Sequence, residues 1–134
     1  MIKYLAAYVG TAAVMVALDM LWLRLIAKTI YQQGIGHLMA DQPRMVVAAL
    51  FYAVYAAGII VFAVVPQAGE STWGKTLTMA ALFGFFAYAT YDLTNLATLR
   101  DWPVGLTLID IAWGTCVSAI SAAGGKLAMD WAAK

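Results

Sequence analysis

Four apolar stretches of the chain are each long enough to cross a lipid bilayer as an α-helix. They cover about residues 4–27, 45–65, 76–99 and 104–124, and a helical crossing needs about 20 mostly apolar residues. Because hydrocarbon offers no partner to backbone polar groups, such a chain crosses the membrane as helices. The sequence therefore predicts an all-α, polytopic membrane protein. We expect a single transmembrane domain over residues 1–134, folded as an antiparallel bundle of four transmembrane helices.

The composition favours this class over a soluble domain. Hydrophobic residues make up 64% of the chain and charged residues 11%, whereas soluble domains average about 45–50% apolar and about 25% charged. The first apolar stretch resembles a signal peptide, but it is too long for the apolar core of one and it carries Asp19. We interpret it as a retained span.

The connections between the stretches set the expected topology. Residues 29–42 are too polar to cross, and they predict a short interfacial segment between helices 1 and 2 that is broken at Gly34 and Gly36. Four crossings would put both termini on the same side. The Lys and Arg residues are divided equally between the two faces, so the positive-inside rule leaves the orientation open. Lys3, before the first span, favours termini in the cytoplasm.

Several functional classes find no support in the sequence. The net charge is +1 and there is no basic run, so we expect no nucleic-acid partner. A single cysteine, Cys116, gives no disulfide framework, and a single histidine, His37, cannot build a four-ligand metal site. There is no glycine-rich phosphate loop and no Ser-His-Asp set. We therefore predict no metal and no cofactor, and membrane lipids as the immediate partners.

Three aspartates fall inside the predicted spans. At a rise of about 1.5 Å per residue, Asp19, Asp92 and Asp110 each lie roughly 6–7 Å from the middle of their span, toward the side of the long loop. Low dielectric and mutual repulsion oppose the ionisation of all three. Either some of them are protonated, or a cation lies among them. Ionisable residues inside a membrane mark functional sites by default.

Other candidate residues share the faces or the depth of these aspartates. Tyr88, Asp92 and Asn95 have the i, i+4, i+7 spacing of one helix face, and two tryptophans lie one turn from an aspartate. Arg24 can pair with Asp19 or extend to the headgroups, and His37 can cap the site from the loop. The predicted binding or proton-relay set is Asp19, Asp92, Asn95, Asp110, Tyr88, Tyr91, Trp22, Trp113, Arg24, Thr107 and His37.

The remaining aromatic and small residues predict packing. Tyr52 and Tyr55 are the only polar side chains of the second span, and we interpret them with the phenylalanines as packing and lipid contact. Gly114, Ser118 and Ala122 allow another helix to approach closely. The polar residues in the spans have an alternative interpretation. They could form interhelical hydrogen bonds that hold the bundle together without any functional site.

Five sequence segments together resemble a known family. They are L-D-M-L-W-L at 18–23, I-Y and G-H-L in the loop, Y-A-T-Y-D-L-T-N-L-A-T-L at 88–99, W-P at 102–103 and I-D-I-A-W-G-T at 109–115. The chain resembles, over nearly its whole length, an uncharacterised family of small four-span bacterial inner-membrane proteins, a domain of unknown function. The resemblance implies a multi-pass protein of the bacterial inner membrane, and it implies no activity.

Three functions are compatible with the sequence. The function that the sequence favours is a small proton- or cation-coupled transport or permeation unit that uses the intramembrane carboxylates. A homodimer is the simplest way to enclose a pathway for it. The alternative is an intramembrane enzyme that modifies a lipid or isoprenoid with an aspartic general acid. The second alternative is a non-catalytic accessory subunit of a membrane complex. The sequence identifies neither the ligand (small solute, ion or lipid) nor whether the protein is an enzyme.

Overall fold

The computed structural model describes residues 1–134, which form helices and no strands. The α-helices are α1 (Ile2–Trp22), α2 (Lys28–Ile35), α3 (Met45–Ile59), α4 (Gly74–Thr98) and α5 (Val104–Ala132). Short π-helical turns at Leu23–Ala27 and Ile60–Val64 extend α1 and α3, and 3-10 turns follow at Gly36–Leu38 and Val65–Gln67. The predicted all-α fold is confirmed.

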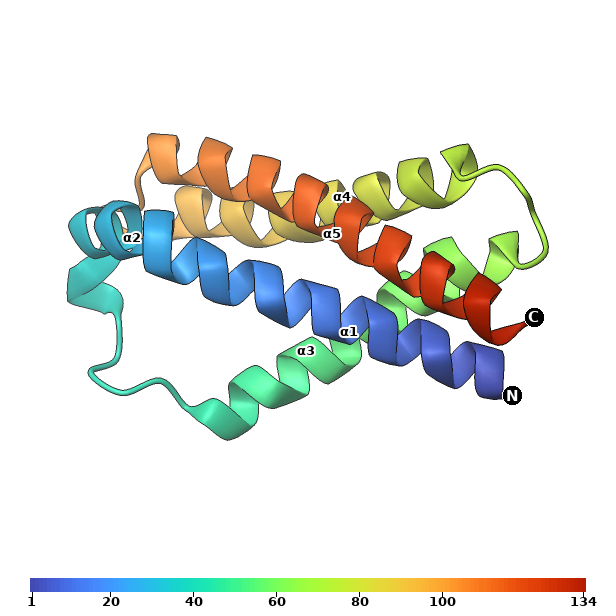
Figure 1. The fold of residues 1–134 in the computed structure, drawn as a ribbon. Coiled ribbons are helices and arrows are strands. Elements are labelled where there is room, and N and C mark those ends of the chain that lie inside the picture. The colour runs from blue at the N-terminus through green and yellow to red at the C-terminus, as the bar shows by residue number, and fades with distance from the viewer.

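Helix α5 is the central element of the arrangement. It packs along α1 on one side and along α4 on the other (Figure 1). Helix α3 contacts α1, and its π-helical extension, Ile60–Val64, also reaches α4 and α5. The two termini lie at the same end of the molecule, and α2 and the turn between α4 and α5 lie at the opposite end (Figure 1).

Three helical segments are long and apolar enough to cross a membrane. They are Ile2–Leu38, Met45–Gln67 and Val104–Ala132. Helix α4 has 25 residues, enough to cross, but polar residues in its second half, such as Asp92 and Asn95, make it less apolar than these segments. The structure thus confirms three helical segments that could cross a membrane, while the crossing of α4 stays a prediction.

Two helices are longer than the sequence suggested. The expected interfacial segment is not a separate helix, because α2 continues α1 through the turn Leu23–Ala27. No proline or glycine interrupts residues 28–33, so the backbone hydrogen bonds continue up to the glycine-containing turn where the helix ends. At the other end of the molecule, α5 continues beyond residue 124 to Ala132. There the completely buried Lys126 donates a hydrogen bond of 2.9 Å to the carbonyl oxygen of Glu70.

Helices α4 and α5 meet at two glycines. A Cβ atom at Gly84 would lie 2.3 Å from the carbonyl oxygen of Gly114 and 2.4 Å from the Ser118 hydroxyl oxygen. A Cβ at Gly114 would lie 2.1 Å from the Tyr88 ring. The prediction that Gly114 and Ser118 admit a neighbouring helix is confirmed, and this close approach sets Tyr88 against α5.

Candidate functional site

Asp19, near the end of α1, is held by side chains from two other helices. The Tyr52 hydroxyl of α3 donates to Asp19 Oδ2 at 2.8 Å, and the Trp113 indole N–H of α5 donates to Oδ1 at 3.0 Å. The Trp113 ring stacks on the Trp22 ring, with centroids 4.2 Å apart and planes 9° from parallel. Both carboxyl oxygens of Asp19 therefore accept a hydrogen bond from a neutral donor.

Asp92 of α4 and Asp110 of α5 form a second acidic group. Asp92 is completely buried, and no hydrogen-bond donor reaches either of its carboxyl oxygens. Its neighbour is the carboxyl group of Asp110, which is 7% exposed. Two adjacent carboxyls in a medium of low dielectric repel each other when both are ionised, and a shared proton removes this repulsion.

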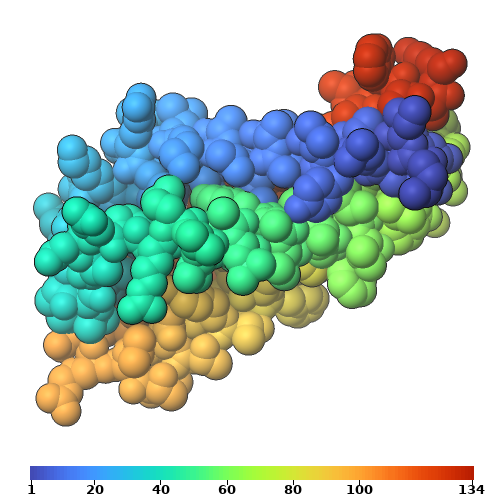
Figure 2. All heavy atoms as spheres, turned by 90° about the horizontal axis from the view of Figure 1, so that it is seen from below, coloured from blue at the N-terminus to red at the C-terminus, as the bar shows by residue number.

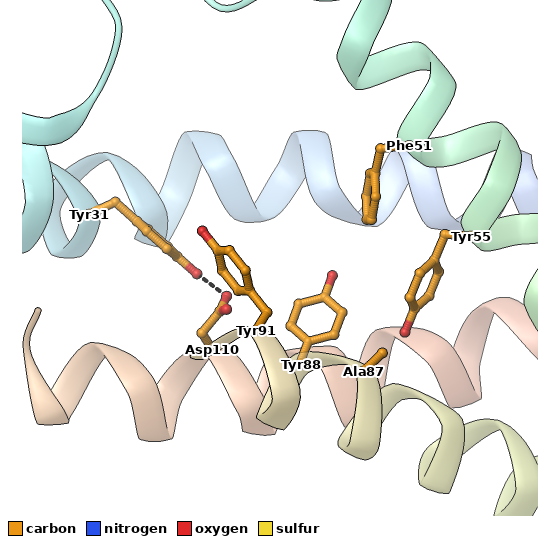
Figure 3. Close-up of a pocket in the computed structure, with 7 residues that line it drawn as sticks. All are labelled: Tyr31, Phe51, Tyr55, Ala87, Tyr88, Tyr91 and Asp110. Carbon is orange, nitrogen blue, oxygen red and sulfur yellow. Dashed lines mark hydrogen bonds between the residues drawn. The ribbon is translucent and has the colours of Figure 1, made fainter. Parts of the chain in front are cut away.

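Tyr31 of α2 closes the site over Asp110. Its hydroxyl donates a hydrogen bond to Asp110 Oδ1 (Figure 3). The Trp22 indole N–H donates in turn to the Tyr31 hydroxyl oxygen at 3.5 Å. Because Trp22 also stacks on Trp113, one chain of contacts joins Asp19 to Asp110. We call Asp19, Asp92 and Asp110 the carboxyl cluster.

No positively charged side chain neutralises the carboxyl cluster. The structure has two ion pairs, His37–Asp101 at 4.0 Å in the loops and Lys126–Asp130 at 3.2 Å at the opposite end. Arg24 is exposed and pairs with neither Asp19 nor any other carboxylate. No three His, Cys, Asp or Glu side chains are placed to hold a metal ion. The cluster is thus acidic without a counter-charge from the chain.

A cavity of about 480 Å³ lies beside the carboxyl cluster. The rings of Tyr88 and Tyr91 rise into it from α4, those of Phe51 and Tyr55 come from α3, and Asp110 lies at one end (Figure 3). We call this space the aromatic cavity; its lining residues are Tyr31, Phe51, Tyr55, Ala87, Tyr88, Tyr91 and Asp110.

The aromatic cavity reaches the outer surface of the bundle. Phe51 and Tyr91, on opposite sides of it, are 43% and 55% exposed. In the space-filling view, α3 lies across the face of the molecule between α1 and α4 (Figure 2). The cavity therefore opens sideways, between α3 and α4.

A smaller cavity of about 170 Å³ lies on the other side of Asp110. It shares Tyr31, Tyr88 and Asp110 with the aromatic cavity. Asp19 lines it together with the two stacked tryptophans and Tyr52. Asp19 and Asp110 therefore face one small space, and Asp92 adjoins it through Asp110.

The family is shown by comparison with known proteins. Residues 4–127 match the family described as "Predicted membrane protein (DUF2177)". The chain belongs to this family. The predicted membership in an uncharacterised family of membrane proteins is confirmed. No curated protein and no solved structure matches the chain.

The predicted site residues of this DUF2177 chain divide into two groups. Those that line a cavity are Asp19, Trp22, Tyr88, Tyr91, Asp110 and Trp113, and Asp92 adjoins Asp110. Asn95, Arg24 and His37 line neither cavity. Thr107 is engaged elsewhere: its hydroxyl accepts a 3.0 Å hydrogen bond from the Trp102 indole and donates one of 3.0 Å to the carbonyl of Pro103.

The sequence did not single out four aromatic residues of the DUF2177 site. Tyr31 belonged to the segment that we expected at the interface, and Tyr52 and Tyr55 were expected to pack or to contact lipid. No role was predicted for Phe51. A signal was present for the two tyrosines of α3. They are the only polar side chains of an otherwise apolar span, and a buried hydroxyl requires a partner. Tyr52 finds Asp19, and Tyr55 lies 2.8 Å from the Ser118 hydroxyl oxygen.

Proposed function

We propose that this chain is an intramembrane enzyme that transfers a proton to and from a lipid or isoprenoid substrate. The observation that carries the proposal is the aromatic cavity, which opens between α3 and α4 and has the Asp110 carboxyl at one end. This choice favours the second of the three functions compatible with the sequence.

The shape and lining of the cavity suit a hydrocarbon chain. Ligand pockets usually measure about 300–1,000 Å³ and are mostly apolar, with a few polar groups that orient the ligand. Here five of the seven lining residues are aromatic, four of them tyrosines, and the other two are Ala87 and Asp110. Because Phe51 and Tyr91 are exposed on the sides of helices that would face lipid, a substrate can enter from the bilayer without crossing water.

The carboxyl cluster supplies the chemistry. A carboxyl group positioned in an apolar pocket can act as a general acid and, after it has given up its proton, as a general base. Protonation of a substrate double bond by Asp110 would leave the carboxylate, and loss of a proton from a neighbouring substrate carbon would restore the acid. Atoms and charge balance without another reactant. Tyr31 orients Asp110 for both steps through its hydrogen bond.

The same account gives the placement in the membrane. We infer that α4 crosses as well, because it has 25 residues and packs along the central helix α5. Four crossings put both termini on the same side of a bacterial inner membrane, and their common end in Figure 1 supports this. Lys3, before the first span, favours the cytoplasmic side. The carboxyl cluster then lies in the half of the bilayer away from the termini.

Comparative lipid analysis tests the proposed enzyme. A strain from which the gene is deleted is complemented with the wild type, with Asp110→Asn, or with Asp41→Asn, a matched change at an exposed loop residue. The proposal predicts a lipid or isoprenoid species whose amount changes on deletion, and that the wild type and Asp41→Asn restore while Asp110→Asn does not. Identical lipid profiles in all four strains would exclude it.

A second function, proton-coupled transport, is favoured by one observation. Asp92 is completely buried and lacks a hydrogen-bond donor, which is a feature of carboxyls that exchange a proton with a cargo ion or solute. The bundle itself is small, so a pathway would form between two copies of the chain.

Flux measurements distinguish transport from the enzyme. Proteoliposomes with an imposed pH gradient would show proton or cation movement with the wild type and a loss of movement with Asp92→Asn. Equal rates for the wild type, Asp92→Asn and empty liposomes would remove transport and leave the enzyme.

A further inference from the structure

We infer that the aromatic cavity binds a cationic centre carried on a hydrocarbon chain, either a quaternary ammonium group or the positively charged carbon of a protonated isoprenoid. The inference rests on the proposed lipid site and names the chemical class that the site stabilises.

Five aromatic rings surround the cavity. They belong to Tyr31, Phe51, Tyr55, Tyr88 and Tyr91, which come from α2, α3 and α4 (Figure 3). The face of an aromatic ring attracts a cation within about 6 Å of its centroid, and cages of such rings recognise quaternary ammonium groups. A neutral hydrocarbon needs only apolar walls, which leucine and valine provide as well. So many rings in one lining therefore favour a positively charged ligand.

Neighbouring side chains hold three of these rings in place. Tyr55 lies 5.5 Å from Phe51 and 6.0 Å from Tyr88, measured between ring centroids. Its hydroxyl is hydrogen-bonded to Ser118, and Tyr88 fits against Gly114, where no Cβ occupies the space. The cage is thus formed before a ligand enters, and its assembly costs little on binding.

The charges point to the same class of ligand. Asp110 lines the aromatic cavity, Asp92 lies beside Asp110, and Asp19 lines the smaller cavity together with Asp110. No Lys, Arg or His pairs with any of them. Buried acidic groups require protons or a positive partner. A cationic centre in the cavity would supply that partner to Asp110, which lines the cavity and is the neighbour of the buried Asp92.

The test compares two amphiphiles with the same chain and different head groups. The purified full chain in neutral maltoside micelles is titrated with dodecyltrimethylammonium or with dodecanol. Binding is followed by the rise in the thermal unfolding midpoint, because a ligand that binds the folded state stabilises it. The inference predicts that the ammonium compound binds more tightly than the alcohol, on the order of tenfold.

Variants at Tyr91 link this preference to the cage. Tyr91 is 55% exposed, and its ring packs edge-on against Trp102 with centroids 5.9 Å apart. Because more than half of the side chain is exposed, we expect its variants to fold. Tyr91→Phe keeps the ring and keeps the preference for ammonium, whereas Tyr91→Leu lowers it. Asp110→Asn lowers it as well, and Asp41→Asn leaves it unchanged.

The outcomes separate the inference from the proposed function. Equal affinity of the wild type for both amphiphiles overturns the inference and leaves the lipid site in place. The absence of binding by either amphiphile overturns both. If the Tyr91→Leu variant keeps the full preference for the ammonium compound, the aromatic cage is not the cause of that preference.

Competition then identifies the source of the natural cation. If phosphatidylcholine displaces the ammonium probe and diacylglycerol does not, the natural ligand is a lipid with an ammonium headgroup. If neither competitor displaces the probe, and the ammonium probe inhibits the lipid conversion, the natural cation is one that forms during the reaction.

Discussion

At the scale of single residues, each aspartate of the carboxyl cluster has its polar neighbour on another helix. Asp19 of α1 accepts from Tyr52 and Trp113, and Asp110 of α5 accepts from Tyr31 and lies beside Asp92 of α4. The same contacts that form the site therefore also hold the helices together. Substitutions must be chosen so that the two roles are measured separately.

Asp92→Asn separates stability from function. An amide has nearly the shape of a carboxyl and brings an N–H donor next to Asp110, where Asp92 has none. We expect the free energy of unfolding in mixed micelles to stay within about 1 kcal/mol of the wild type or to rise, while the lipid conversion is lost. Asp92→Ala, which leaves a void, is the contrasting variant and should cost about 2 kcal/mol or more. A large loss of stability in Asp92→Asn would contradict a shared proton between Asp92 and Asp110.

Tyr31→Phe tests how Asp110 is oriented. The change removes the hydroxyl that donates to Asp110 and keeps the ring of the cage. We expect the rate of the lipid conversion to fall by roughly tenfold or more, since correct placement of a general acid is worth about 10²–10⁴ in rate. The preference for an ammonium amphiphile should persist. Tyr4→Phe, at a tyrosine outside both cavities, is the control, and a rate for Tyr31→Phe equal to that control would exclude the orienting role.

At the scale of helices, the site depends on the close packing of α4 on α5. Gly84 admits the carbonyl oxygen of Gly114 at a distance that no Cβ atom tolerates. This contact is between backbones, so rotation of a side chain cannot relieve a clash there.

Gly84→Ala should therefore destabilise the bundle. The expected loss is about 1–3 kcal/mol in the free energy of unfolding, the usual cost of overpacking. The matched control is Gly105→Ala, where an added Cβ would have no atom within 4 Å and where alanine should be neutral or stabilising by up to about 1 kcal/mol. Equal stability of the two variants in micelles would show that α4 and α5 are not packed in this way.

Much of the element scale could be predicted from the sequence. The long apolar stretches predicted the long helices, and Gly114 and Ser118 predicted a close contact with another helix. The continuation of α1 into α2 was missed. The polarity of residues 29–33 indicates that this segment is exposed to water, but it does not indicate whether the helix ends there. For the same reason, the last span was predicted to end at residue 124, before the buried Lys126.

The sequence groups the aspartates by their expected depth, but it does not identify their partners. Depth follows from counting residues along a helix. The rotation of each helix about its axis depends on packing, and this rotation decides that Tyr52 and Trp113 meet Asp19 while Asn95 lies outside both cavities. Sequence spacing alone grouped Asn95 with Asp92 on one face.

At the scale of the whole molecule, the account requires four crossings. Single cysteines placed at Lys3, in the loop after α3 at Ser71, and in the loop before α3 at Asp41, in a Cys116→Ala background, report which side each loop occupies. We expect Lys3 and Ser71 positions to react with a membrane-impermeant thiol reagent from the cytoplasmic side only. The Asp41 position should react from the opposite side. Labelling of Lys3 and Asp41 positions from the same side would contradict the inferred topology.

The central claim, a lipid site inside the bundle, is tested most directly by photo-crosslinking. A long-chain lipid analogue with a photoreactive group in its tail is activated in membranes that contain the chain, and the labelled peptides are identified by mass spectrometry. The account predicts saturable labelling at Tyr88 and Phe51, which unlabelled substrate lipid displaces. Labelling that does not saturate and is spread evenly over the outward-facing residues of α1 and α3, such as Val9 and Val46, would contradict it.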